Sequence, residues 1–417
     1  MIYFGLIAGL LFIILSVWRS DWAIFLLILS LPAYQVRWQI LGLPTTSLEI
    51  MILIIFLVSL VKNRFKGWRI KSGHWQWLIL LWLVAGLISV VVASDYLGAL
   101  GYWRAYFLEP ILLLLVILDL LAKNRFSKNH IIFALGLSAL VCTTWAIAQK
   151  WLGGGVMSTE VWGAPKVWRA TGPFPQPNFL GLYIGPIALL CFGQFIQYFK
   201  SKKWLAIFYG IVFVLSLTAA ILARSDGTML GMIIGLIFLG LYWRKSRRAT
   251  IILVIIVTLI IFLVPSTRHF MMERLAFQKL SGQLRLNIWQ GAWAMIKDHP
   301  MLGVGLRNYQ NLATQYQEFY YQPQTGQLIS TETHHYPHNL FLAIWVELGL
   351  LGLLVFLAIL IKFFIQGHKT TKTNISTPLV TISIMAALIA IVAHGLVDTP
   401  YFKNDLSTLF WLIIVLL

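Results

Sequence analysis

Two arginines and a cluster of histidines are the residues of this 417-residue sequence best suited to chemistry. Arg224 stands between two apolar segments, and Arg285 is followed four residues later by Trp289. A guanidinium can bind a phosphate through two parallel hydrogen bonds, and an aromatic face suits a sugar ring. The alternatives are an ion pair of Arg224 with Asp226 and a basic Arg285 side chain lying over an interfacial aromatic belt.

The histidine cluster comprises His334, His335 and His338, which lie within five residues. Pro337 and the apolar run after it place His338 at the start of a helix. A histidine there could act as a general base or hydrogen-bond a hydroxyl, and a helix N-terminus favours the neutral imidazole. Helix capping and a metal site are the alternatives. A metal site has little support, because no acidic residue stands at ligand spacing and the chain has no Asp-x-Asp pair.

Two further residues are candidates for substrate binding. Arg169 precedes a stretch rich in proline and glycine, residues 170–178, which predicts a stiff loop shaped as a wall. Its alternative role is loop capping. Glu347 lies inside an apolar segment, where a carboxylate is costly and is a functional candidate by default. Its alternative role is a structural hydrogen bond to a neighbouring helix.

The composition shows which elements must position these residues. The chain is 59% hydrophobic and only 11% charged, where soluble domains carry about 25% charged residues, so a soluble enzyme and a disordered chain are excluded. We predict an all-α polytopic membrane protein with about 12 or 13 transmembrane helices in one domain, 1–417. The expected spans are 2–17, 22–34, 47–61, 75–93, 101–121, 130–149, 178–199, 204–222, 227–243, 249–264, 338–366, 376–396 and 406–417. The first two and the last are short enough to be tilted, re-entrant or merged.

Charge explains the orientation. The net charge is +18, and seventeen basic residues with no acidic counterpart fall in five loops on one side of the spans. Those loops are 62–74, 122–129, 200–203, 244–250 and 367–374. This asymmetry predicts that they face the cytoplasm and that the candidate residues face the periplasm or cell exterior. With 13 spans the N-terminus is outside; if the first two segments form one unit, both ends are inside.

The longest external loop, 265–337, carries its own helical pattern. Apolar residues recur at Leu284, Ile288, Ala292 and Ile296, and a second stripe runs from Leu306 to Tyr320. Asp298-His299-Pro300 should end the first helix, and Gly303 and Gly305 should form a turn. We therefore expect two amphipathic helices in this loop. The two cysteines, Cys142 and Cys191, lie in apolar runs and predict no disulfide.

The order of the motifs is specific. Arg224-Ser-Asp-Gly opens a helix with glycines four apart, and Arg285-Leu-Asn-Ile-Trp289 follows in the long loop. Next come Asp298-His-Pro-Met-Leu-Gly-Val-Gly305, then Pro337-His-Asn-Leu-Phe-Leu342, and then Glu347-Leu-Gly-Leu-Leu-Gly352. In this order they resemble the O-antigen ligase / O-antigen polymerase superfamily of bacterial membrane glycosyltransferases. The resemblance covers about residues 150–400; the first 150 match only as generic spans.

The resemblance implies a metal-independent inverting glycosyltransferase of the cytoplasmic (inner) membrane, without cofactors, acting at the periplasmic face. Its donor would be a glycan on undecaprenyl diphosphate. Arg224 and Arg285 would bind the diphosphate, and His338 would orient or deprotonate the acceptor hydroxyl. Arg169, Trp289, His335 and Glu347 are expected to contact substrate. Asp226 departs from the family pattern, in which a small or apolar residue is more usual.

The sequence does not identify the acceptor. The pattern around His338 favours an O-antigen ligase, with lipid A–core as acceptor in lipopolysaccharide biosynthesis. A polymerase of O-antigen or another cell-envelope polysaccharide and a protein O-oligosaccharyltransferase are the enzyme alternatives. A transporter of a glycolipid or small anion is the non-enzyme alternative. It should show repeated halves and charges at mid-membrane, whereas the candidate charges gather at one face. Nucleic acid is not an expected partner, because the excess charge lies in orientation loops.

Overall fold

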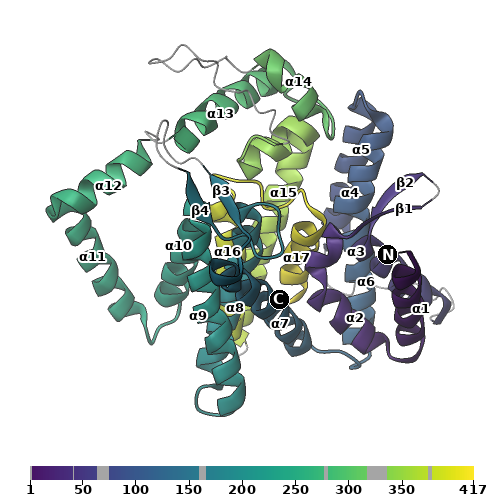
Figure 1. Ribbon diagram of the computed structural model, residues 1–417, viewed down its shortest axis with the longest axis horizontal. Helices are drawn as coiled ribbons and strands as arrows, with labels where there is room; N and C mark the ends of the chain where they lie inside the picture. The colour runs from purple at the N-terminus through teal and green to yellow at the C-terminus, as the bar shows by residue number, and fades with distance from the viewer. Residues whose placement is uncertain are drawn as a thin grey trace.

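The computed structural model describes residues 2–40, 42–62, 75–158, 166–276, 280–316, 336–373 and 378–417. Regular structure in these ranges is almost entirely helical, which confirms the all-α prediction (Figure 1). The first helices are α1 (Ile2–Trp18), α2 (Ser20–Leu29), the 3₁₀-helix η1 (Leu31–Gln35), α3 (Ser47–Lys62), α4 (Trp75–Val92), α5 (Tyr96–Trp103), the π-helical turn η2 (Arg104–Leu108), α6 (Glu109–Ala122) and α7 (Lys128–Leu152). The others are α8 (Pro177–Tyr198), α9 (Lys203–Ala223), α10 (Asp226–Tyr242), α11 (Arg247–Leu263), α12 (Pro265–Leu275), α13 (Leu280–Asp298), α14 (Asn308–Tyr316), α15 (Leu340–Thr373), α16 (Pro378–His394) and α17 (Asn404–Val415).

Six of the described helices are long and apolar enough to cross a membrane, or seven if α11 and α12, bent by 93°, form one span. Five more described apolar helices have 10–17 residues, among them α2 and α17. At 1.5 Å per residue, a 10-residue helix covers roughly half of the hydrocarbon core. The chain is therefore a multi-pass membrane protein, and the total of 12 or 13 full spans stays a prediction.

Two short β-hairpins lie in segments predicted as external loops. β1 (Arg37–Ile40) pairs with β2 (Leu43–Thr46), and β3 (Val156–Ser158) pairs with β4 (Val167–Arg169), both antiparallel. The sequence does not predict these hairpins, because strands of three or four residues show too little apolar–polar alternation. β4 matters for the site because it ends at Arg169.

The long loop that the sequence predicts to be external contains the two expected helices. α13 ends at Asp298, as Pro300 predicts, and α14 begins at Asn308 after the turn that contains Gly303 and Gly305. Their apolar stripes are buried together in a small core with Ile288, Ala292, Met295, Tyr309 and Ala313. α12 was not predicted, since its residues show no clear apolar period. Figure 1 shows α13 and α14 beside one end of α15, and α11 and α12 extending away from the other helices.

α15 is broken at Gly349, and the loop before α14 fills the break. Gly349 has φ +69° and ψ −171°, so the helical hydrogen-bond ladder is interrupted there. The backbone N–H of Leu350 donates to the carbonyls of Pro300 (3.2 Å) and Met301 (3.1 Å), and that of Val304 donates to the carbonyl of Val346 (2.7 Å). Two of the sequence motifs, residues 298–305 and 347–352, are therefore partners in one structural joint.

This joint predicts a strong effect of Gly349→Ala. A Cβ atom at position 349 would lie 2.1 Å from the carbonyl oxygen of Met301, on a backbone with positive φ. Strain and overpacking together should lower the free energy of unfolding by about 2–5 kcal/mol. Thermal unfolding in detergent measures the effect. Gly101→Ala is the matched control, because its Cβ would meet nothing within 4 Å; equal stability of the two variants would contradict the prediction.

Candidate functional site

His338 lies directly before α15 in a strained backbone conformation. Its φ is +48°, in the left-handed region that non-glycine residues rarely adopt. Asn339 caps the helix, since its Oδ1 accepts hydrogen bonds from the backbone N–H groups of Phe341 (3.0 Å) and Leu342 (3.1 Å). Strain of this kind persists where the surroundings hold a residue in place, and it gathers at functional sites. The chain thus holds His338 at the positive end of the α15 dipole.

The start of α15 is bonded to the last residue of α16 and the four residues after it. We name these five residues the 394–398 turn (His394-Gly-Leu-Val-Asp398). The backbone N–H of Leu340 donates to the carbonyl of Gly395 (2.7 Å). The side-chain amide of Asn339 donates to the carbonyl of Leu396 (3.0 Å). His338 Nδ1 lies 3.2 Å from Asp398 Oδ1. Segments about 60 residues apart in the chain therefore meet at His338.

Asp398 is a buried carboxylate that faces two histidines. Its Oδ1 accepts from the backbone N–H of Thr399 (2.8 Å), and its Oδ2 lies 4.0 Å from His394 Nε2. Burial acts to raise the pKa of Asp398, but the hydrogen bond to His338 and nearby positive charge outweigh it and hold that pKa below its usual range. An ionised carboxylate only accepts hydrogen bonds. When the imidazole of His338 is neutral, a proton on Nδ1 makes this hydrogen bond and leaves the lone pair on Nε2.

α13 brings Arg285 and Trp289 to the same turn. Arg285 Nε donates to the carbonyl of Val397 (2.9 Å), and Trp289 Nε1 donates to the carbonyl of His338 (3.4 Å). The two residues are one helical turn apart, so they lie on one face of α13. α13 thus places a guanidinium at the 394–398 turn and an indole beside His338, and the roles predicted for Arg285 and Trp289 stay predictions.

The N-terminus of α10 also packs on the 394–398 turn. A Cβ added at Gly227 would lie 2.5 Å from His394 Cδ2 and 3.0 Å from Val397 Cγ2, so only glycine allows this approach. Arg224 stands three residues earlier, at the C-terminus of α9, with φ +47°. Arg224 is exposed. Two of the three predicted catalytic residues, Arg224 and His338, are thus held in left-handed backbone.

Arg169 supports the end of α9. Its Nε donates to the carbonyl of Ala223 (2.8 Å), and its Nη2 donates to the carbonyl of Arg224 (3.3 Å) and to Asn178 Oδ1 (3.1 Å). These bonds satisfy carbonyl groups that a helix C-terminus leaves without an intrahelical partner. Arg169 therefore fixes the backbone that carries Arg224, and its role as a substrate ligand stays a prediction.

Glu347, another predicted residue, is not brought to His338. Glu347 is fully buried in α15, nine residues along the chain from His338, which corresponds to roughly 13 Å of helix. Within the described parts of the chain, neither of its carboxylate oxygens has a hydrogen-bond partner. His335 and His334 lie outside the described residues. No group of three or more His, Cys, Asp or Glu side chains that could hold a metal ion occurs among the residues described.

Asp398 and His394 are not among the residues predicted from the sequence. The signal was present, because a histidine and an aspartate four residues apart, at the outer end of a predicted span, are rare in an apolar chain. Only the fold shows that α10, α13 and α15 all meet at the 394–398 turn.

Comparison with known proteins gives a family model that covers part of this site and ends before the 394–398 turn. Residues 211–357 match a family model described as O-antigen ligase, and the match includes Arg224, Arg285 and His338. An uncharacterised protein of Haemophilus influenzae is 23% identical over 334 residues, which cover 74% of this chain and 75% of that protein. A protein of Mesostigma viride named "Putative peptidoglycan glycosyltransferase FtsW" is 25% identical over 339 residues, 76% of this chain and 73% of its own length.

Proposed function

We propose that the protein transfers a glycan from undecaprenyl diphosphate to an acceptor hydroxyl. The proposal starts from residues 211–357, whose match to the O-antigen ligase family model supports membership of that superfamily. The domain supports a membrane glycosyltransferase-like function. The hydrogen bond from His338 to the buried Asp398, beside Arg285, is the observation that carries the finer proposal. We place the site at the periplasmic face of the inner membrane, opposite the basic loops.

The arginines would act on the donor. When the glycosidic bond breaks, its electron pair leaves with the diphosphate oxygen, and negative charge grows there. Arg285 bonds to the 394–398 turn, and Arg224 stands three residues before Gly227, which packs on that turn. The two arginines would hold the diphosphate from different helical segments. Fixed guanidinium groups stabilise such charge more in the departing diphosphate than in the bound donor, which is what accelerates the step.

His338 would act on the acceptor. Its Nε2 would take the proton of the acceptor hydroxyl while the hydroxyl oxygen attacks the anomeric carbon from the face opposite the diphosphate, which inverts that carbon. Asp398 would hold the imidazole orientation and stabilise the imidazolium that forms. The chain's own groups supply both the base and the charge stabilisation, and we therefore propose transfer without a metal ion.

Ligase activity is the version of this reaction that we favour, with lipid A–core as acceptor. The same donor chemistry would serve polymerisation or protein O-glycosylation. The name of the Mesostigma relative also denotes glycosyl transfer, which supports the reaction class and not the acceptor.

A reconstituted assay tests the proposal. Purified protein is mixed with glycan-linked undecaprenyl diphosphate and with lipid A–core, with donor alone, or with an acceptor protein. We expect the glycan to appear on lipid A–core, with release of undecaprenyl diphosphate, and an unchanged rate in excess EDTA. Loss of transfer in EDTA would refute the metal-free mechanism. Absence of transfer to lipid A–core, to a second donor molecule and to the acceptor protein would refute glycosyltransferase activity.

Orientation has its own prediction. In a Cys142→Ala, Cys191→Ala background, single cysteines are placed at Gln290 on α13 and at Lys245 between α10 and α11; both positions are exposed. A thiol reagent that cannot cross the membrane should label position 290 in intact spheroplasts, and position 245 only after lysis. The reverse pattern would overturn the topology.

A further inference from the structure

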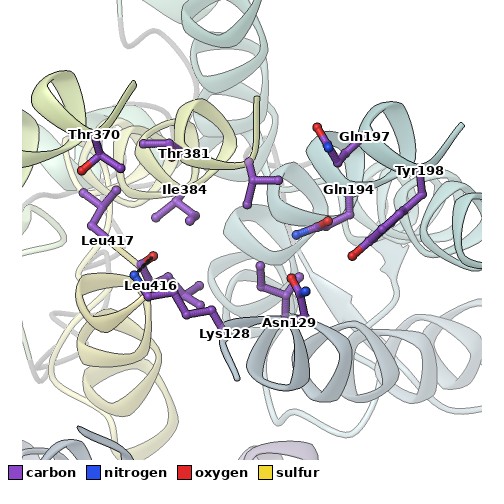
Figure 2. A pocket seen from close by; sticks show the side chains of 12 residues that line it. Lys128, Asn129, Gln194, Gln197, Tyr198, Thr370, Thr381, Ile384, Leu416 and Leu417 are labelled. Carbon is purple, nitrogen blue, oxygen red and sulfur yellow. Dashed lines mark hydrogen bonds between the residues drawn. The ribbon is translucent and has the colours of Figure 1, made fainter. Parts of the chain in front are cut away.

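A cavity of about 290 Å³ lies at the end of the helix bundle that carries the basic loops. It is formed by the first turn of α7, the last turns of α8, α15 and α17, and the first turns of α16 (Figure 2). Its size is near the lower end of small-ligand pockets. The candidate functional site lies at the opposite ends of α15 and α16, so this cavity has no part in the proposed transfer.

Gln194 is the unexplained group in the cavity. Its side chain is 1% exposed, and neither its Nε2 nor its Oε1 has a hydrogen-bond partner within the described residues. Figure 2 shows the amide pointing into the cavity from α8. A buried amide without partners is costly, and native proteins satisfy almost all such groups. The polar side chain therefore indicates an occupant.

The lining favours an anion. Lys128, Asn129 and Tyr198 supply an ammonium, an amide and a phenol, and α15 and α16 add the hydroxyls of Thr370 and Thr381. Lys128 Nζ donates to the carbonyl of Leu416 (2.9 Å), which uses one of its three N–H donors. No Asp or Glu side chain is among the described residues that line the cavity. The set is thus rich in donors, as phosphate oxygens require.

Its surroundings add positive charge. The ammonium of Lys202 lies 6.0 Å from the ring centroid of Tyr198, and the loops 122–129, 200–203 and 367–374 next to the cavity contain only basic charges. Apolar side chains, Ile384 and Leu416 among them, complete the wall. Basic pockets between membrane helices at this face are suited to lipid head groups.

We propose that this cavity binds a phosphate group, as presented by the head group of an anionic membrane lipid, with Gln194 and Lys128 as its ligands. The proposal is independent of the glycan transfer. A lipid phosphate and a free phosphate ester offer the same oxygens, and the probes below separate them.

Thermal unfolding of the delipidated protein in detergent tests the proposal, read by tryptophan fluorescence. The probes are dioctanoyl phosphatidylglycerol, dioctanoylglycerol and glycerol 3-phosphate, each titrated over the same concentrations. We expect the phospholipid to raise the melting temperature in a saturable way and the phosphate-free lipid to leave it unchanged. Gln194→Leu should raise the apparent Kd for the phospholipid about tenfold, because one hydrogen bond to a charged group is lost.

A control variant and a second cavity variant accompany Gln194→Leu in this test. Gln310→Leu, a half-buried glutamine of α14 outside the cavity, should bind the phospholipid like the wild type. Should Gln194→Leu not fold, Thr381→Val, which removes only a lining hydroxyl, is expected to weaken binding severalfold. A shift by glycerol 3-phosphate equal to that by the phospholipid supports the site with a free phosphate ester as ligand. No saturable shift by either phosphate probe, or equal shifts in Gln194→Leu and wild type, overturns the proposal.

Discussion

His338→Ala is expected to lower the rate of glycan transfer by about 10²–10⁴-fold, the contribution of a positioned general base. The acceptor hydroxyl would lose the group that removes its proton, while donor binding by the arginines would remain. The reconstituted assay should therefore show a large fall in kcat and little change in the KM for the donor. Asp398→Asn should give a smaller loss, because the imidazole remains but its orientation and tautomer are no longer fixed.

His269→Ala is the matched control for this prediction. His269 is an exposed histidine on α12, in the same external segment. It should retain the wild-type rate at equal membrane expression. Wild-type transfer by His338→Ala would remove the base from the mechanism, and an equal loss in His269→Ala would show that the assay reports folding and not chemistry.

Arg285→Ala is expected to lower transfer by about 10²–10³-fold, and Arg224→Ala by a similar factor, since each would remove a group that stabilises the departing diphosphate. Arg285→Lys should recover only part of the rate, because lysine keeps the charge and loses the planar fork that holds two oxygens. The donor KM should rise in both alanine variants, in contrast to His338→Ala. This difference separates donor residues from the base.

Arg268→Ala serves as the control for charge alone. Arg268 is an exposed arginine on α12 whose removal changes the net charge by the same amount. It should leave both kcat and KM near wild type. Transfer that survives loss of both Arg224 and Arg285 would exclude them as diphosphate ligands.

Much of the architecture could be predicted because apolar runs and basic loops are strong signals. The α13 helix, its end at Asp298 and the turn at Gly303 were anticipated from periodicity and one proline. The hairpins β1–β2 and β3–β4 were not, because very short strands depend on tertiary contacts more than on local pattern.

The site was predicted less completely. Residue type and spacing predict Arg285, Trp289 and His338 as site residues, and the structure brings them together at the 394–398 turn and the start of α15. Asp398 was missed, because its partnership with His338 spans 60 residues and arises only when α15 and α16 pack. Glu347 was expected at the site because carboxylates are rare in membrane helices, but it lies beside the break in α15. Long-range contacts of this kind cannot be read from spacing.

The 394–398 turn makes chain length a requirement of the site. It is only five residues long, and α10, α13 and α15 all touch it. One inserted residue extends a chain by up to about 3.6 Å, more than the 3.2 Å between His338 and Asp398. Relatives that share this chemistry should therefore keep the length of the turn as well as Asp398 at its end.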